Sequence, residues 1–84
     1  MNVKMYTTTF CPYCIRAKML LKKKSIAFEE IPVGRDPQMR MQLVEMTGMR
    51  TVPQIFINDK SIGGFDELYA LERAGRLDEM IQNN

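Results

Sequence analysis

The hydrophobic pattern divides the first part of the chain into a strand and a helix. Residues 2–8 ("NVKMYTT") are rich in strand-forming residues and predict a strand with Val3 and Met5 on one face. Pro12 suits the first turn of a helix, because the N–H that proline lacks would have no helical partner there. From Pro12 to Lys24 the apolar residues recur at helical spacing. One face of this predicted helix collects Cys14, Ala17, Leu20 and Leu21.

The middle of the chain predicts a second strand followed by a second helix. Residues 25–33 ("SIAFEEIPV") form the strand, and Pro32 favours an edge position, where a ladder donor can be spared. Asp36 and Pro37 are typical of an N-cap and the first helical position. Gly48 ends this helix. Its shared apolar face is formed by Met39, Leu43 and Met46.

The last part of the chain predicts a hairpin and two helices. Residues 52–58 ("VPQIFIN") are almost continuously apolar, as in a buried central strand, and a tight turn leads to a short strand at 61–63. Gly63 and Gly64 precede a helix that Gly75 ends, and residues 76–82 form a short final helix.

These elements predict one α/β domain over residues 1–84, with the order β-α-β-α-β-β-α and a short helix added. A helix joins the first two strands, so we expect them to be parallel with a right-handed crossover. The last two strands form an antiparallel hairpin. The expected architecture is a four-stranded mixed sheet with helices on both faces.

The composition and charge of the chain argue against several classes of protein. A net charge of +2 over 84 residues is too weak to indicate a nucleic-acid binder. The run 22–24 of three lysines is typical of the last turn of a helix, where the macrodipole favours cations. No stretch is long and apolar enough to span a membrane, and no signal peptide is visible, so we expect a cytoplasmic protein.

The chain's two cysteines, Cys11 and Cys14, allow three interpretations. A structural zinc site needs four ligands, mostly cysteine and histidine, and the chain has no histidine. We therefore expect no metal in a single chain. A disulfide that closes so short a loop would add little stability, which weakens the structural interpretation. The Cβ atoms of residues three apart on a helix are about 5–6 Å apart. This separation suits a disulfide that can open and close with little movement. The spacing thus favours a redox pair.

The two thiols are predicted to be unequal. Cys11 comes just before the helix start, where unpaired backbone N–H groups and the helix dipole favour a thiolate. Cys14 is one turn inside on the apolar face, where burial favours the neutral thiol. We expect Cys11 to attack the substrate and Cys14 to resolve the intermediate.

Three motifs give the chain a family resemblance. "CPYC" at 11–14, "TVP" at 51–53 and "GG-x-D" at 63–66, in this order and spacing, resemble a dithiol glutaredoxin over nearly the whole chain. The resemblance implies a thioredoxin-like fold. It also implies a glutathione-dependent thiol–disulfide oxidoreductase, with glutathione as the reducing co-substrate, that acts on protein disulfides and glutathione mixed disulfides.

The resemblance also implies a glutathione site. The bond between Val52 and Pro53 is expected to be cis, with the backbone of Val52 facing the site, where it could pair with an extended peptide. Backbone N–H groups near Gly64 could hold a carboxylate at a helix start, and Asp66 could meet an ammonium. The full set of expected glutathione-binding residues is Tyr13, Arg40, Thr51, Val52, Pro53, Gly64 and Asp66. Simpler interpretations remain open for Tyr13 as a packing residue and for Asp66 as a helix cap.

Two positions depart from the family pattern. Thr8 stands where many glutaredoxins carry a lysine, so Arg40 and Arg50 are the expected replacement cations. Phe65 stands where a small residue or cysteine is common. A phenylalanine at this position makes the chain resemble the glutaredoxin-like redoxins as well. Those redoxins are reduced by thioredoxin reductase and donate electrons to ribonucleotide reductase. That redoxin is the main alternative, and a carrier of an iron–sulfur cluster between two chains is another.

The partners implied by the resemblance are glutathione and disulfide-containing or glutathionylated proteins, with ribonucleotide reductase as one candidate. No nucleic acid or membrane is expected, and the protein is expected to be a monomer.

Overall fold

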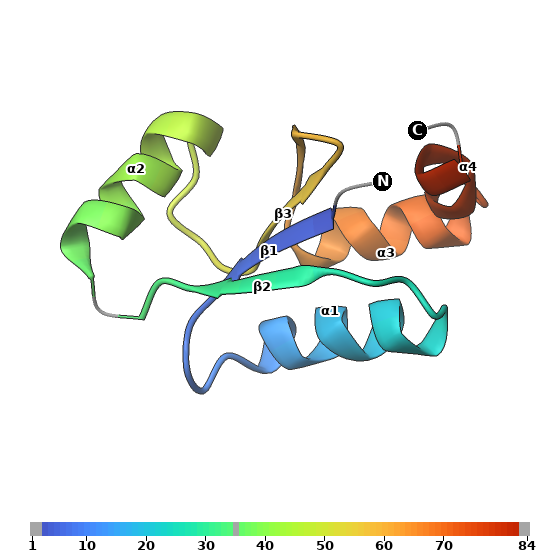
Figure 1. The fold of residues 1–84 in the computed structure, drawn as a ribbon, viewed down its shortest axis with the longest axis horizontal. Coiled ribbons are helices and arrows are strands. Elements are labelled where there is room, and N and C mark those ends of the chain that lie inside the picture. Colours follow the sequence, from blue (N-terminus) through green and yellow to red (C-terminus); the bar gives the residue numbers. More distant parts are fainter. Residues whose placement is uncertain (1–2, 35, 83–84) are drawn as a thin grey trace.

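The computed structural model describes residues 3–34 and 36–82 of the chain. Its elements follow one another in the predicted order (Figure 1). They are β1 (Val3–Thr7), α1 (Pro12–Lys23), β2 (Glu29–Pro32), α2 (Pro37–Thr47), β3 (Gln54–Ile57), β4 (Lys60–Gly63), α3 (Phe65–Arg73) and α4 (Leu77–Gln82).

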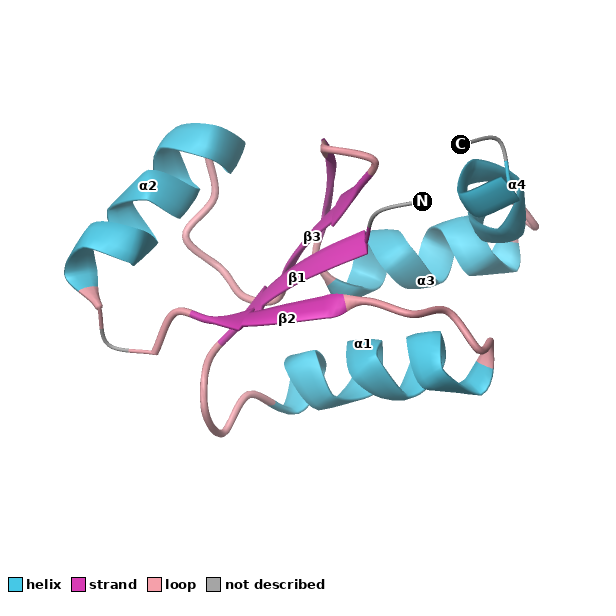
Figure 2. Ribbon diagram, in the orientation of Figure 1, coloured by secondary structure: helices cyan, strands magenta, loops and turns pink. Residues whose placement is uncertain are grey.

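The strands form one four-stranded mixed sheet with the order β2-β1-β3-β4 (Figure 2). β1 pairs with β2 in parallel and with β3 antiparallel, and β3 and β4 form the predicted hairpin. β2 lies at an edge, as Pro32 indicated, because a proline there removes no ladder bond toward a further strand. The predicted fold class is confirmed.

The main core lies between one face of the sheet and three helices. Val3, Met5, Ile55 and Ile57 point to this face and are almost fully buried. They pack against side chains of α1, α3 and α4, namely Ala17, Leu21, Leu68 and Leu77. Burial of these residues is the main source of stability for so small a fold.

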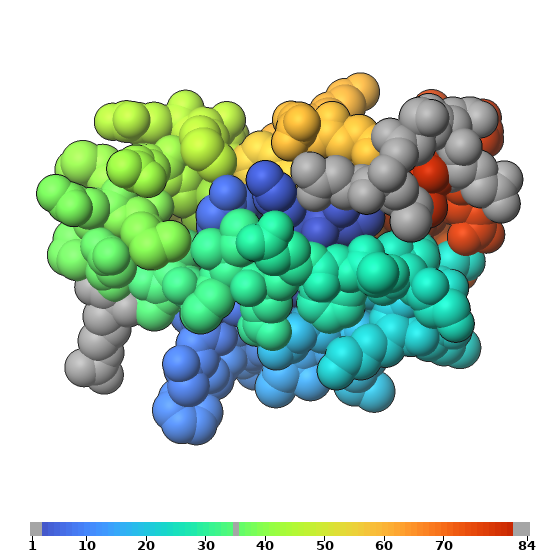
Figure 3. Space-filling view, viewed as in Figure 1, coloured from blue at the N-terminus to red at the C-terminus, as the bar shows by residue number. Residues whose placement is uncertain are grey.

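α2 lies on the other side of the sheet from α1, so helices cover both faces (Figure 1). On this second face, Tyr6 and Phe56 meet edge to face, with ring centroids 5.6 Å apart. Met46 of α2 lines a hollow together with both rings. The space-filling view shows α2 at one end of the molecule, with β2 crossing the front between α2 and the C-terminal helices (Figure 3).

The expected helical face of α2 is buried only in part. Leu43 is buried and Met39 is half-buried, but Met46 is 53% exposed. α2 therefore packs less closely on the sheet than α1 does.

Two predicted strands are shorter in the structure than expected. Residues 25–28 do not join β2, because Ser25 adopts a left-handed conformation (φ 60°) that ends α1. Backbone hydrogen bonds from Ser25 N–H to Lys22 O and from Ile26 N–H to Leu21 O complete this C-terminal motif. Residues 52–53 precede β3 as a loop, because Val52 and Pro53 belong to a cis turn.

Lys24, the last of the three consecutive lysines, caps α1 and also joins three helices. Its Nζ lies 2.7 Å from Glu72 of α3 and 3.1 Å from Asp78 of α4. These carboxylates raise the pKa of Lys24, first through hydrogen bonds and then through their charge. The run of lysines thus anchors helices in addition to meeting the α1 dipole. None of the helices described for this chain is long and apolar enough to cross a bilayer.

Candidate active site

Cys11 is the N-cap of α1, and its sulfur faces the open end of the helix. The backbone N–H of Cys14 donates to Cys11 Sγ at 3.2 Å. The sulfur also lies 3.6 Å from the carbonyl oxygen of Val52. Both cysteines are free thiols, with Cys11 half-buried and Cys14 buried. A thiolate at Cys11 would therefore meet a backbone donor and the positive end of the helix dipole.

Cys14 is the opposite kind of thiol, since its side chain is only 1% exposed. Burial, and after it the hydrogen bond with Cys11, raises the pKa of Cys14 from 9.0 to about 12. A hydrogen bond from the Thr8 backbone and the positive charge of Lys18 act in the opposite direction. When Cys11 is held in a mixed disulfide, its contribution disappears and those of Thr8 and Lys18 remain. Cys14 therefore ionises more readily at the step at which it must attack.

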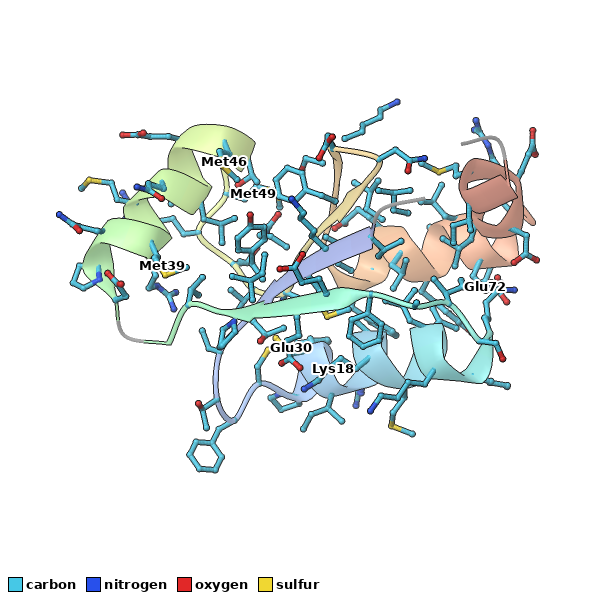
Figure 4. All side chains as sticks on the ribbon, viewed as in Figure 1. Lys18, Glu30, Met39, Met46, Met49 and Glu72 are labelled. Carbon is cyan, nitrogen blue, oxygen red and sulfur yellow. The ribbon has the colours of Figure 1, made fainter. Side chains whose placement is uncertain are left out.

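A polar group that sequence reasoning missed lies behind the cysteine pair. Glu30 Oε2 accepts hydrogen bonds from Thr7 Oγ1 at 2.8 Å and from Lys18 Nζ at 3.1 Å, and Figure 4 shows Lys18 and Glu30 side by side between α1 and β2. The Thr7 and Lys18 hydrogen bonds lower the pKa of Glu30. Both cysteines, Lys18 and Glu30 line one hollow. Lys18 lies four residues after Cys14, a spacing that the sequence shows, but its partner on β2 could not be read from the sequence.

The buried thiol predicts a pH-dependent stability. Above pH 9, Cys14 ionises in the unfolded chain but stays protonated in the folded one, so stability falls as pH rises toward about 12. One such group contributes a slope of at most about 1.4 kcal/mol per pH unit. We expect the free energy of unfolding of the reduced protein, measured with urea, to fall more steeply above pH 9 than that of Cys14→Ala. Parallel pH profiles for the two proteins would contradict the buried-thiol interpretation.

Two loops bring the other motifs to the cysteines. The Val52–Pro53 peptide bond is cis, as the family resemblance implied. A Cβ on Gly64 would lie only 3.1 Å from the Pro53 carbonyl oxygen, so a larger residue would crowd the close approach of the two loops. The buried side chain of Gln54 donates through Nε2 to Thr51 O at 2.8 Å and to Thr51 Oγ1 at 3.1 Å. These contacts hold the loop that presents the Val52 backbone to Cys11.

The α3 helix begins directly after this contact. Gly64 is its N-cap, and the Gly64 N–H donates to Glu67 Oε1 at 2.6 Å. Glu67 therefore fulfils the capping role that the sequence left open for Asp66. Asp66 is exposed, and within the described parts of the chain its carboxylate has no hydrogen-bond or ion-pair partner. It is available to a ligand at the same end of α3.

Arg40 and Arg50 lie on the α2 side of the Val52 loop. Together with Val52 and Met49 they line a hollow of about 470 Å³. Arg40 Nη1 donates to the carbonyl oxygen of Gly34 at 3.3 Å. Of the contacts described for the chain, none joins Arg40 to the cysteine pair, so the two arginines extend the site beyond Val52.

Tyr13 and Phe65 form the opposite wall. Tyr13 is 52% exposed, and its ring centroid lies 6.4 Å from that of Phe65. Phe65 is half-buried and also packs against the core. The phenyl ring that departs from the family pattern therefore fills the seam between α1 and α3 and supports Tyr13.

Three of the motif segments come together near Cys11. Cys11 meets the Val52 backbone, the cis-proline loop meets Gly64, and Asp66 follows in the first turn of α3. Within residues 3–34 and 36–82, no three cysteine or acidic side chains come together as a metal-binding group. A reactive thiol beside an exposed backbone edge can exchange disulfides with an extended peptide.

Comparisons with known proteins agree with this chemistry. The family model "Glutaredoxin" matches residues 3–62. The chain is 51% identical over 79 residues to a glutaredoxin of Pseudomonas aeruginosa, covering 94% of each chain. It is 46% identical over 81 residues to glutaredoxin 3 of Escherichia coli, covering 96% of this chain and 98% of that protein.

Solved structures give the same result. A buckwheat glutaredoxin–glutathione complex matches with a TM-score of 0.91 at 30% identity, covering 98% of this chain and 77% of that one. A Brucella melitensis glutaredoxin matches with a TM-score of 0.86 at 46% identity, covering 96% and 88%. These matches do not favour the redoxin alternative. The chain therefore belongs to the glutaredoxin family, and its Cys11–Cys14 pair makes it a thiol–disulfide oxidoreductase.

Proposed function

We propose that this oxidoreductase binds glutathione, the co-substrate of the glutaredoxin family, along the groove that starts at Cys11. The observation that carries the proposal is the position of Cys11 Sγ, which accepts the Cys14 N–H and lies 3.6 Å from the Val52 carbonyl oxygen. A tripeptide whose cysteine is bonded to Cys11 would have its own backbone beside that of Val52. Strand-like pairing there would fix its orientation.

The two ends of glutathione require opposite chemistry. Its γ-glutamyl end carries an ammonium and a carboxylate on one carbon. The carboxylate of Asp66 would meet the ammonium, and the N–H groups at the start of α3, after Gly64, would hold the carboxylate. The glycine carboxylate would lie toward Arg40 and Arg50, beyond Val52 and Thr51. Tyr13 would form the apolar wall.

The single-thiol reaction removes glutathione from a substrate. The Cys11 thiolate attacks the glutathione sulfur of a mixed disulfide, and the substrate leaves as a thiolate that takes up a proton. A second glutathione thiolate then attacks the glutathione sulfur on Cys11. This step releases the Cys11 thiolate and forms oxidised glutathione, so the substrate thiol is restored and one added glutathione thiol is consumed.

The two-thiol reaction reduces a protein disulfide. Cys11 attacks one sulfur, and the other leaves as a thiolate. Cys14 then attacks the sulfur of Cys11, the partner's second thiolate leaves, and an internal disulfide forms between Cys11 and Cys14. Two glutathiones reduce this disulfide in turn. The protein substrates would be disulfide-containing or glutathionylated proteins, ribonucleotide reductase among them. The oxidoreductase would act on them in the cytosol as a monomer.

The test of this function compares two reductants. Oxidised protein is offered glutathione with glutathione reductase, or thioredoxin reductase alone, and NADPH consumption is followed. We expect fast reduction by glutathione and background rates with thioredoxin reductase. The reverse result would contradict the proposal and support the redoxin alternative.

Asp66→Asn is expected to weaken glutathione recognition. The side chain is exposed, so loss of its charge should cost roughly 1 kcal/mol, or about a fivefold rise in KM for a glutathionylated substrate. The matched control is Asp59→Asn, which removes a carboxylate from the β3–β4 turn. Asp59 lines a hollow away from the cysteines. Initial rates at varied substrate concentration give KM. An unchanged KM in Asp66→Asn, or an equal rise in both variants, would remove Asp66 from the site.

A further inference from the structure

A row of neighbouring aromatic and arginine side chains leads away from the active site across α1 and α3. We define the arginine–aromatic ladder as Arg16, Tyr13, Phe65, Tyr69 and Arg73. Arg16 lies over the Tyr13 ring at 5.4 Å, and Arg73 lies over the Tyr69 ring at 5.9 Å. Between them, the Phe65 ring lies 6.4 Å from Tyr13 and stacks on Tyr69 at 5.8 Å.

The ladder is open to a partner. Tyr13 is 52% and Tyr69 46% exposed, and both arginines are exposed. Neither Arg16 nor Arg73 has an ion-pair partner among the described residues, unlike Lys18 and Lys24 of the same region. A guanidinium that lies over an aromatic ring can still use its N–H groups to bind a carboxylate.

We propose that the arginine–aromatic ladder is a docking surface for protein substrates whose reactive cysteine lies in an extended, acidic segment. Tyr13, the second member of the ladder, lies two residues from Cys11 in the sequence, so a segment bonded to Cys11 is delivered onto the ladder. Its four steps of 5.4 to 6.4 Å match at most about seven residues of extended chain. The proposal rests on the proposed action on protein disulfides.

Charge complementarity selects this kind of partner. The two unpaired guanidinium groups attract carboxylates, and the three rings offer flat apolar surface between them. Asp66 and Glu67, also on α3, lie near its start, and Glu67 is occupied by the Gly64 N–H. Acidic residues of the partner would therefore be placed toward Arg16 and Arg73 and away from the first turn of α3.

The test uses peptides whose single cysteine is joined by a disulfide to the chromophore 5-thio-2-nitrobenzoate. The Cys11 thiolate attacks the peptide sulfur, a new disulfide joins the peptide to Cys11, and the coloured thiolate leaves. One extended peptide carries glutamates after its cysteine, and a second carries glutamines at the same positions. The disulfide of free cysteine with the same chromophore reports the reactivity of Cys11 without docking.

We expect reduced wild-type protein to react about fivefold faster with the glutamate peptide than with the glutamine peptide at low salt. The double variant Arg16→Gln/Arg73→Gln should lose this preference and react with the cysteine disulfide at the wild-type rate. The control Lys23→Gln/Arg76→Gln removes the same net charge from exposed positions outside the ladder and should keep the preference.

Several results would overturn the proposal. Equal rates with both peptides in the wild type would exclude recognition of acidic segments. An equal loss of the preference for the glutamate peptide in both double variants would show that the preference depends only on the net charge of the protein. Light scattering that showed a wild-type dimer, dissociated by the ladder variant, would assign the surface to a second copy of the chain. Failure with all three disulfides would instead contradict the thiol chemistry itself.

Discussion

Replacing Cys11 with serine is expected to reduce both reactions, deglutathionylation and protein disulfide reduction, to the uncatalysed background. Every route begins with attack by the Cys11 sulfur, and a serine hydroxyl cannot exchange with a disulfide. The fold should survive, because serine is a favourable N-cap and its Oγ can accept the Cys14 N–H that Cys11 Sγ accepts now.

The measurement is NADPH consumption coupled through glutathione reductase, with a glutathionylated peptide and with a protein disulfide as substrates. Urea unfolding of Cys11→Ser should give a midpoint close to that of the reduced wild type, which shows that the lost activity is chemical. Activity that persisted in a folded Cys11→Ser protein would mean that Cys14 or another group is the nucleophile.

Replacing Cys14 with serine is expected to separate the two reactions. Deglutathionylation needs only Cys11 and a second glutathione, so it should persist, and it should rise if the internal disulfide competes with it. Reduction of a protein disulfide through the dithiol route should fall to background, because no second protein thiol remains to release the partner from Cys11. The Cys11 sulfur is the leaving group when the second glutathione attacks, and the start of α1 and the Cys14 N–H face the negative charge that develops on it.

The same pair of assays, run on Cys14→Ser, provides the measurement, and trapping of a stable mixed disulfide with the protein substrate adds a direct readout. Cys14→Ala serves as the matched variant, because it removes the thiol without burying a hydroxyl at a position that is 1% exposed. Loss of deglutathionylation in both folded variants would show that the single-thiol route is wrong.

The geometry explains why the two cysteines divide the work. Cys11 is held at the helix start with a backbone donor, and Cys14 is kept protonated by burial. Lys18, which Glu30 holds in place, then gives Cys14 a nearby positive charge at the resolving step. A dithiol enzyme needs this order, because two equally ionised thiols would repel one another and neither would be favoured as the leaving group.

The local features of this protein could be predicted from its sequence. Pro12 and Asp36 indicated where two helices begin, and the apolar runs indicated the strands of the sheet. The Cys11–Cys14 spacing indicated a redox pair at a helix N-terminus. Such signals act between residues a few positions apart, through backbone hydrogen bonds and side-chain periodicity. The strand predicted for 25–33 was too long, because Ser25 ends α1 in a left-handed conformation that glycine usually signals.

Only the tertiary structure decided which distant residues meet. Val52 lies 41 positions from Cys11, and its carbonyl reaches the sulfur because β1 and β3 are paired in the sheet. The Lys18–Glu30 pair and the Tyr13–Phe65 contact arise in the same way, across α1 and β2 and across α1 and α3. Contacts of this kind depend on strand register and helix packing over the common core, which local sequence patterns do not encode.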